Sequence, residues 1–186
     1  MRSAGLYSLT LGIILSLSAC LTWEGAQLPA SEWSPLLRLA PISYNLPLDY
    51  APWTIRYCDE TGVPIWLASR MFSVESSGDP LGPWNKRAVS YMGAQGLAQL
   101  MPFNLSSFAS RYNDGKVIDP FDPETAIRVG IRYLADLYGE TGSWSVALKS
   151  YNGGISHYYE PWKWGPWREE SVQYAIKILG KEKLGL

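Results

Sequence analysis

The stretch Val74-Glu75-Ser76 is followed by Ser90-Tyr91-Met92-Gly93-Ala94-Gln95-Gly96-Leu97-Ala98-Gln99 and later by Ser150-Tyr151-Asn152-Gly153-Gly154. These three pieces place one carboxyl group ahead of several neutral hydrogen-bonding side chains. The first piece ends a helical pattern, and glycines mark turns in the other two. Their order and spacing decide how the rest of the chain is interpreted.

The carboxyl group of Glu75 continues an apolar helical stripe. Ala68, Met71 and Phe72 precede it by seven, four and three residues, which are the spacings of one helix face. Burial among such groups disfavours the charged form of a carboxyl and raises its pKa, as a general acid requires near neutral pH. Taken alone, Glu75 is better explained as a helix-end glutamate that reaches solvent, because exposed glutamates are common.

The composition indicates an ordinary globular protein. Hydrophobic residues make up 47% and charged residues 18% of the 186 residues, and this length fits one compact domain plus accessory segments. The formal net charge is -1, so no nucleic-acid partner is expected. His157 is the only histidine. A histidine triad or a histidine-rich metal site is therefore not expected, and no cofactor is predicted.

Residues 1–19 have the features of a bacterial lipoprotein signal peptide. The apolar run over residues 9–15 is too short for a membrane span. The junction Leu17-Ser18-Ala19-Cys20 resembles a lipobox, in which Cys20 becomes the lipidated first residue. The alternative is an ordinary signal cut after Ala19, which would leave Cys20 as a thiol.

The segment after the signal carries regularly spaced prolines, so residues 20–46 are predicted to form a lipidated N-terminus and a proline-rich tether. With lipid on Cys20, Cys58 is left unpaired, and no structural disulfide is expected. The anchor predicts a membrane partner and a place in the cell envelope. It would lie either on the outer side of the cytoplasmic membrane or in the outer membrane facing the periplasm.

The remaining chain predicts a mainly α fold of the α+β class. Asp122-Pro123 and Ser143 are helix starts, because their side-chain oxygens can cap a first turn and proline presets φ. Small and β-favouring groups over residues 88–100 predict one short hairpin. Further helices are predicted over residues 49–59, 64–76, 102–112 and 169–179.

Taken together, these pieces resemble the soluble lytic transglycosylase family, relatives of goose-type lysozyme. The resemblance is carried by Glu75-Ser76, by the run from Ser90 to Gln99 with Leu100-Met101-Pro102, and by Tyr151-Asn152-Gly153-Gly154. It spans about residues 49–174 and implies a lysozyme-like helical domain over residues 47–186, with the small hairpin at its cleft. It also implies cleavage of the β-1,4 bond between N-acetylmuramic acid and N-acetylglucosamine in peptidoglycan, with a 1,6-anhydro product.

The resemblance also implies roles for single residues. Glu75 would be the catalytic acid and base. Ser90 and Gln99 would line the cleft and hold sugar hydroxyl or N-acetyl groups. Tyr151 and Asn152 would face Glu75 across the groove, and Tyr174 would complete that wall. Gln99 could instead be a buried structural amide, and Tyr151 could belong to the core.

The chemistry of a single acid agrees with this implication. Glycosidases usually need two carboxyl groups. Asp79 follows Glu75 by four residues, but Gly78 breaks the helix between them, so their separation is not fixed by the sequence. Without a second carboxylate, the sugar's own C6 hydroxyl can attack in place of water. A hydrolytic muramidase and a non-catalytic glycan-binding lipoprotein remain the alternatives.

Three departures from the family pattern stand out. Residues 81–86 are inserted between the acid and Ser90, Ala98 replaces a usual methionine, and Ser150 replaces a usual alanine. A dense aromatic stretch with Trp162, Trp164 and Trp167 precedes the last predicted helix. Its rings could stack on sugars, cover a core edge or rest at a lipid interface.

Overall fold

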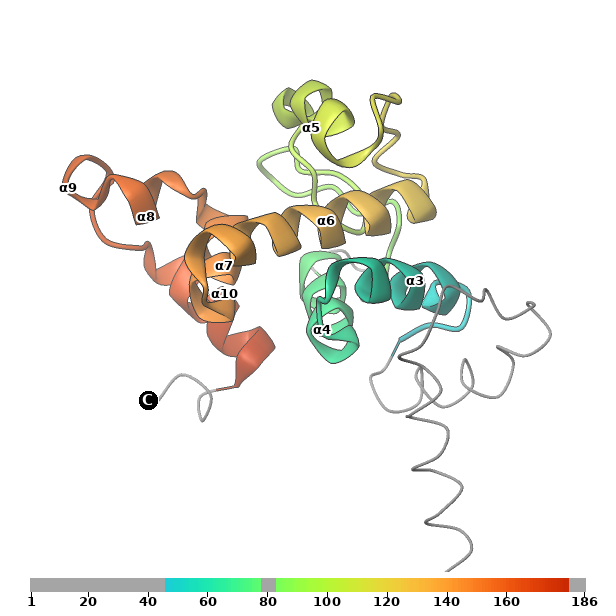
Figure 1. The fold of residues 1–186 in the computed structure, drawn as a ribbon, viewed down its shortest axis with the longest axis horizontal. Coiled ribbons are helices and arrows are strands. Elements are labelled where there is room, and N and C mark those ends of the chain that lie inside the picture. Colours follow the sequence, from blue (N-terminus) through green and yellow to red (C-terminus); the bar gives the residue numbers. More distant parts are fainter. Residues whose placement is uncertain (1–45, 78–82, 181–186) are drawn as a thin grey trace, which may run out of the picture. The chain divides into compact units, whose positions relative to one another are not determined.

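Helices make up most of the described structure, as the sequence predicts (Figure 1). The computed structural model describes residues 46–77 and 83–180. In chain order its helices are α3 (Ala51–Thr61), α4 (Ile65–Glu75), the 3-10 helix η1 (Pro102–Asn104), α5 (Leu105–Tyr112), α6 (Pro123–Thr141), α7 (Trp144–Gly153), α8 (Ser156–Tyr159), α9 (Pro161–Trp164) and α10 (Glu169–Leu179). The mainly α class is confirmed, whereas α8 and α9 were not predicted.

Prolines and capping side chains set the helix starts, which is why the sequence locates them well. Pro52 lies in the first turn of α3, and Pro64 directly precedes α4. The Thr125 backbone N–H donates to Asp122 at the start of α6, 2.9 Å away. Ser143 accepts from the backbone of α7 in the same way. Both predicted caps are therefore confirmed.

The predicted hairpin does not form as a strand pair in the described residues. Between residues 88 and 100, two isolated antiparallel bridges pair Gln95 with Val89 and with Leu100. Three residues of this segment have left-handed φ values, namely Gly93 (85°), Gly96 (73°) and Gln99 (47°). The chain turns at each of them, so a ladder cannot extend, and the predicted small sheet was wrong in this respect.

Gly96 lets this turn-rich segment approach the chain before α6. A Cβ atom at this position would lie 1.7 Å from the carbonyl oxygen of Pro120, a distance that no side chain can adopt. The backbone N–H of Gly96 donates to the carbonyl oxygen of Ala88 at 2.9 Å. This glycine therefore closes the turn and fixes it against the rest of the domain.

The long helix α6 forms the centre of the described domain. Its buried residues recur at helical spacing and include Ile127, Ile131 and Leu134. Helix α6 packs against both α3 and α7, and α10 packs against both α7 and α4 (Figure 1). The packing of α4 on α10 brings Glu75, the last residue of α4, to residues almost 100 positions later in the chain.

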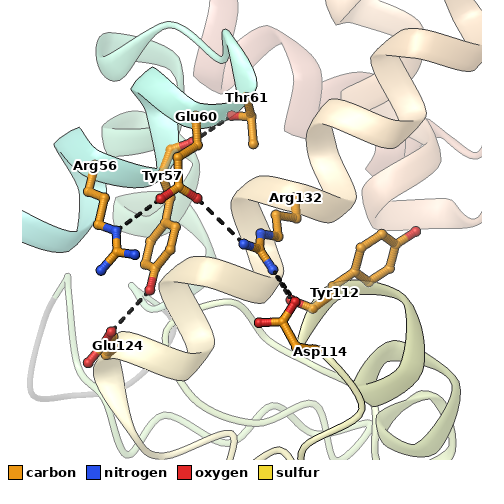
Figure 2. Close-up of polar contacts among 8 residues, drawn as sticks. All are labelled: Arg56, Tyr57, Glu60, Thr61, Tyr112, Asp114, Glu124 and Arg132. Atoms are coloured by element: carbon orange, nitrogen blue, oxygen red, sulfur yellow. Dashed lines mark hydrogen bonds and ion pairs between the residues drawn. The ribbon is translucent and has the colours of Figure 1, made fainter. Parts of the chain in front are cut away.

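A polar cluster on the surface connects α3 with α6 (Figure 2). The Tyr57 hydroxyl donates to Glu124 at 3.0 Å, and Arg132 donates to the Tyr112 carbonyl oxygen at 3.1 Å. Arg132 also contacts Asp114 at 3.3 Å and Glu60 at 3.5 Å. Such exposed ion pairs contribute little to stability, so the cluster mainly fixes how the helices meet.

Several sequence predictions lie outside the described residues. They are the signal peptide over residues 1–19, the lipidation site Cys20, the tether up to residue 45, and Asp79. Among the helices of the described part, none is both long and apolar enough to cross a bilayer. Cys58 is buried as a free thiol.

Candidate active site

Glu75 lies at the C-terminal end of α4 and is half-buried. The hydroxyl of Tyr174, on α10, donates to Glu75 Oε1 at 2.5 Å. Tyr174 is itself buried, with 6% of its surface exposed. The carboxyl group is therefore largely removed from water, yet part of the side chain stays accessible.

Burial raises the pKa of Glu75 from 4.5 to about 7, and the hydrogen bond from Tyr174 opposes this rise. The sign is the one that the apolar stripe predicted. A carboxyl group with this pKa holds a proton on a large fraction of molecules near neutral pH. It can therefore act as an acid and, after losing the proton, as a base.

Tyr151 connects α7 to the turn-rich segment. Its hydroxyl donates to the carbonyl oxygen of Ala98 at 2.9 Å, and its ring lies 5.1 Å from that of Tyr133. Burial, and then the negative charge of Glu75, raise the pKa of Tyr151 well above its ordinary value. Tyr151 thus lies within electrostatic reach of Glu75, and its hydroxyl proton is already engaged by the backbone.

Ser90 and Gln99 both bond to the backbone of their own segment. The Ala94 N–H donates to Ser90 Oγ at 3.0 Å. The amide group of Gln99 donates to the carbonyl oxygen of Gly96 at 2.8 Å and, more weakly, to that of Ala88 at 3.4 Å. The amide nitrogen of Gln99 is thereby occupied, so its side-chain oxygen is the group left to meet a ligand. Both residues shape the turn.

Asn152 lies one residue beyond Tyr151 and borders a cavity of about 320 Å³. Ser171 Oγ donates to Asn152 Oδ1 at 2.8 Å. Gly153 permits this closeness of α7 and α10, because a Cβ there would lie 2.5 Å from Ser171 Oγ. The cavity is lined by Met92, Asn152, Gly153, Ser156, His157, Arg168, Glu170 and Ser171.

Glu75 does not line the cavity. The cavity borders α10, however, and this helix carries Tyr174, the hydrogen-bond partner of Glu75. Glu170 lines the cavity and Tyr174 follows it by one turn of α10. The structure thus brings Glu75, Tyr151 and Tyr174 together, and places Asn152 at the adjoining cavity. Ser90 and Gln99 lie in the segment whose backbone accepts the Tyr151 hydroxyl.

The aromatic residues that precede α10 lie in two different environments. Trp162 is 79% exposed on α9, and Tyr159 is half exposed at 50%. The ring of Trp167 lies 5.3 Å from that of His157, which lines the cavity. Trp167 is therefore close to the cavity wall, whereas Trp162 faces solvent.

Sequence reasoning missed two contributors to the site. Ser171, opposite Gly153, lies in a predicted helix and within the stretch that the family resemblance includes, but no role was predicted for its side chain. Ser76 is fully buried directly after Glu75, and its hydroxyl accepts from the backbone N–H of Trp84 at 2.6 Å. A serine directly after the candidate acid was visible in the sequence, but its partner in the inserted segment was not.

The comparisons with known proteins agree with this architecture. Residues 62–179 match the sequence model of the Transglycosylase SLT domain. This match covers more than half of the chain, so the chain belongs to the Transglycosylase SLT domain family. The family resemblance predicted from the sequence is confirmed, and the prediction of a lytic transglycosylase holds at the level of the family.

Curated relatives are much longer than this chain. The soluble lytic murein transglycosylase of Escherichia coli K12 is 28% identical over 133 residues, which cover 69% of this chain and 19% of that protein. The protein of the same name from Escherichia coli O157:H7 matches to the same extent. The chain thus spans about a fifth of the length of these relatives.

Solved structures share the fold. The complex of a 70-kDa soluble lytic transglycosylase with bulgecin A has a TM-score of 0.58 and 24% identity, covering 80% of this chain and 25% of that one. An inactive mutant of the lytic transglycosylase Slt from Pseudomonas aeruginosa has a TM-score of 0.55 and 20% identity, covering 78% of this chain and 25% of that one. These likenesses support the lysozyme-like helical fold.

Proposed function

We propose that this protein is a peptidoglycan lytic transglycosylase that cleaves the β-1,4 bond between N-acetylmuramic acid and N-acetylglucosamine. It releases a 1,6-anhydromuramoyl product, with Glu75 as the only acid and base. The observation that carries the proposal is the half-buried Glu75 carboxyl, bonded to the Tyr174 hydroxyl at 2.5 Å and with its pKa raised to about 7. Family membership and the murein named for the relatives support the choice of substrate.

The first step is a proton transfer from Glu75 to the glycosidic oxygen. The bond between C1 and that oxygen breaks, and the N-acetylglucosamine side leaves as an alcohol. The substrate's own N-acetyl oxygen stabilises the positive charge at C1, as in substrate-assisted glycosidases. Tyr174 then donates its hydrogen bond to a carboxylate, and such a bond is stronger when the acceptor is charged.

In the second step, Glu75 takes the proton of the C6 hydroxyl as that oxygen bonds to C1. Glu75 regains its proton, the ring closes, and no water enters the product. The attack is intramolecular, so it gains from the high effective concentration of the C6 hydroxyl. This sequence needs one carboxyl group rather than two.

The neutral neighbours of Glu75 suit this role. Burial is the main cause of its raised pKa, and the hydrogen bond from Tyr174 is the only opposing cause. No cation contributes among the described residues. An arginine or lysine beside Glu75 would stabilise the carboxylate and lower the pKa, which would leave less of the acid form at neutral pH.

The proposal is tested by mass analysis of fragments released from purified sacculi. Glu75→Gln should abolish cleavage in a folded protein, while Glu169→Gln, which removes an exposed charge from α10, should not. Products of the wild type should be lighter by one water than those of a hydrolase. Products that carry the added water would indicate a muramidase. If the wild type and Glu75→Gln bind sacculi equally well and neither cleaves them, the protein is a glycan-binding protein and not an enzyme.

The place of the proposed enzyme follows from its N-terminal sequence. We infer a lipoprotein held in the cell envelope through Cys20, with residues 20–46 as the tether and residues 47–186 as the catalytic domain. The support is the lipobox over residues 17–20 together with a polymeric substrate that lies outside the cytoplasm.

A further inference from the structure

Trp84 has an unusual conformation for its position next to the site. It lies in the segment that departs from the family pattern and has a left-handed φ of 65° although it is not a glycine. The residue is 94% buried, with 6% of its surface exposed. A bulky side chain adopts such a φ only when its surroundings hold it there, and strain of this kind is concentrated at functional sites.

The backbone of Trp84 is connected to the helix that carries Glu75. Its N–H donates to Ser76 Oγ at 2.6 Å, and the Ser76 hydroxyl donates to the carbonyl oxygen of Phe72 at 2.7 Å. The serine proton can point to only one acceptor, so the chain of bonds runs from Trp84 through Ser76 to Phe72. Phe72 precedes Glu75 by three residues and Ser76 follows it directly. The last turn of α4 is thus held on both sides of the acid.

The ring of Trp84 holds the same turn by packing. It lies 5.6 Å from the ring of Phe72 and 5.8 Å from that of Tyr50. The Phe72 ring also packs closely on α6, because a Cβ at Gly130 would lie 3.0 Å from it. The indole N–H of Trp84 is buried without a hydrogen-bond partner among the described residues. The ring therefore acts through its shape and not through a hydrogen bond.

We propose that Trp84 is a positioning residue for Glu75: its backbone N–H and its ring together fix the end of α4 and keep the carboxyl aimed at Tyr174. This inference rests on the proposed function, because a fixed acid matters only if Glu75 transfers a proton. The groups that face Glu75 are Tyr174 of α10 and Tyr151 of α7, both neutral. Loosening the turn admits water to the carboxyl, which favours its charged form.

Three variants separate the contribution of the Trp84 ring from that of the hydrogen bond between the Trp84 backbone and Ser76. Trp84→Gly keeps the backbone N–H, tolerates the left-handed φ and removes the ring. Ser76→Ala keeps the ring and removes the acceptor. Trp84→Phe keeps the backbone N–H and an aromatic ring, although a smaller one without the unpartnered indole N–H, so it is the ring-retaining comparison for Trp84→Gly.

We expect Trp84→Gly and Ser76→Ala to lower kcat by about tenfold or more with little change in KM, because a small displacement of a catalytic group costs rate and not binding. The alkaline limb of the pH–rate profile should move to lower pH in both variants. In Trp84→Phe, which keeps an aromatic ring, kcat and the alkaline limb should lie closer to the wild-type values than in Trp84→Gly. Assays are run well below the unfolding temperature of each variant. If both variants are less stable but keep the wild-type kcat and pH profile, Trp84 is only structural and the inference fails.

A second readout does not depend on cleavage. The titration of the Glu75 carboxyl can be followed by carbon NMR of glutamate-labelled protein and assigned with Glu75→Gln. Its midpoint should fall in Trp84→Gly and Ser76→Ala and lie closer to the wild-type value in Trp84→Phe. A wild type that never cleaves sacculi, with these midpoints still shifting, would overturn the proposed function and leave the positioning of Glu75 intact. Equal midpoints in all variants would overturn the inference.

Discussion

Replacing Glu75 with glutamine should make the folded protein more stable, and the gain should grow with pH. The pKa of the carboxyl is raised by burial from 4.5 to about 7 in the folded protein. Between these two values the folded protein keeps a proton that the unfolded chain has released. The free energy of unfolding of the wild type must therefore fall as the pH rises through this range. Glutamine carries no charge at any of these pH values and escapes this loss.

The size of the effect follows from the two pKa values. Each pH unit between them is worth about 1.4 kcal/mol, so the wild type should lose about 3 kcal/mol between pH 4.5 and 8 relative to Glu75→Gln. Below pH 4.5 the two proteins should be nearly equal, because a protonated carboxyl and an amide are similar in shape and both accept the hydrogen bond of Tyr174. For a domain of this size, the difference above pH 7 corresponds to about 6–12 °C in Tm.

The measurement is urea unfolding followed by tryptophan fluorescence at pH values from 4 to 8, with Glu169→Gln as the control for loss of an exposed charge. The free energy of unfolding of Glu169→Gln should differ from that of the wild type by the same amount at each pH from 5 to 8. If the advantage of Glu75→Gln does not grow between pH 5 and 8, the carboxyl is not desolvated. The reasoning that makes it an acid would then be refuted.

Three further outcomes are expected. Tyr174→Phe removes the bond that lowers the pKa of the catalytic carboxyl, so the alkaline limb of the pH–rate profile should move to higher pH; a limb that stays in place would contradict this. Gly96→Ala should lower the free energy of unfolding, measured with a chemical denaturant, by more than about 3 kcal/mol, because its Cβ would lie 1.7 Å from the Pro120 oxygen. Its control, Gly93→Ala, meets nothing within 4 Å and should lower it by about 1–2 kcal/mol from the positive φ alone. Cys20→Ala should move the protein from the membrane to the soluble fraction, and unchanged partitioning would argue against a lipid anchor.

The sequence was a good guide where a local rule decides the structure. Asp122 and Ser143 cap their helices as predicted, because a side-chain oxygen and the following backbone N–H groups meet whatever the rest of the chain does. Helix caps need only the neighbours within one or two turns. The apolar stripe before Glu75 gave the direction of the pKa change expected on burial, but burial itself was favoured only through the family resemblance.

Local rules failed where the structure depends on conformation or on distant partners. The β-favouring residues around Gln95 suggested a hairpin, but the left-handed φ of Gln99 could not be inferred from its side chain. The hydrogen bond between Glu75 and Tyr174 joins residues 99 positions apart. No periodicity predicts that contact, and Tyr174 was singled out only through the family resemblance. Two short helices, α8 and α9, likewise lie in a stretch that has no apolar period.

The departure at Ala98 shows how the site tolerates a change that the sequence could not interpret. Its side chain is fully buried, and a Cβ at Gly130 would lie only 3.0 Å from it. Two small residues therefore meet here, and α6 approaches the turn-rich segment closely. The carbonyl oxygen of Ala98 in turn receives the Tyr151 hydroxyl. The side chain of Ala98 faces α6, and its backbone connects it to Tyr151 through this hydrogen bond. Because Gly130 already lacks a side chain, a longer side chain at position 98 has room only if α6 moves away, so we expect Ala98→Met to lower the free energy of unfolding.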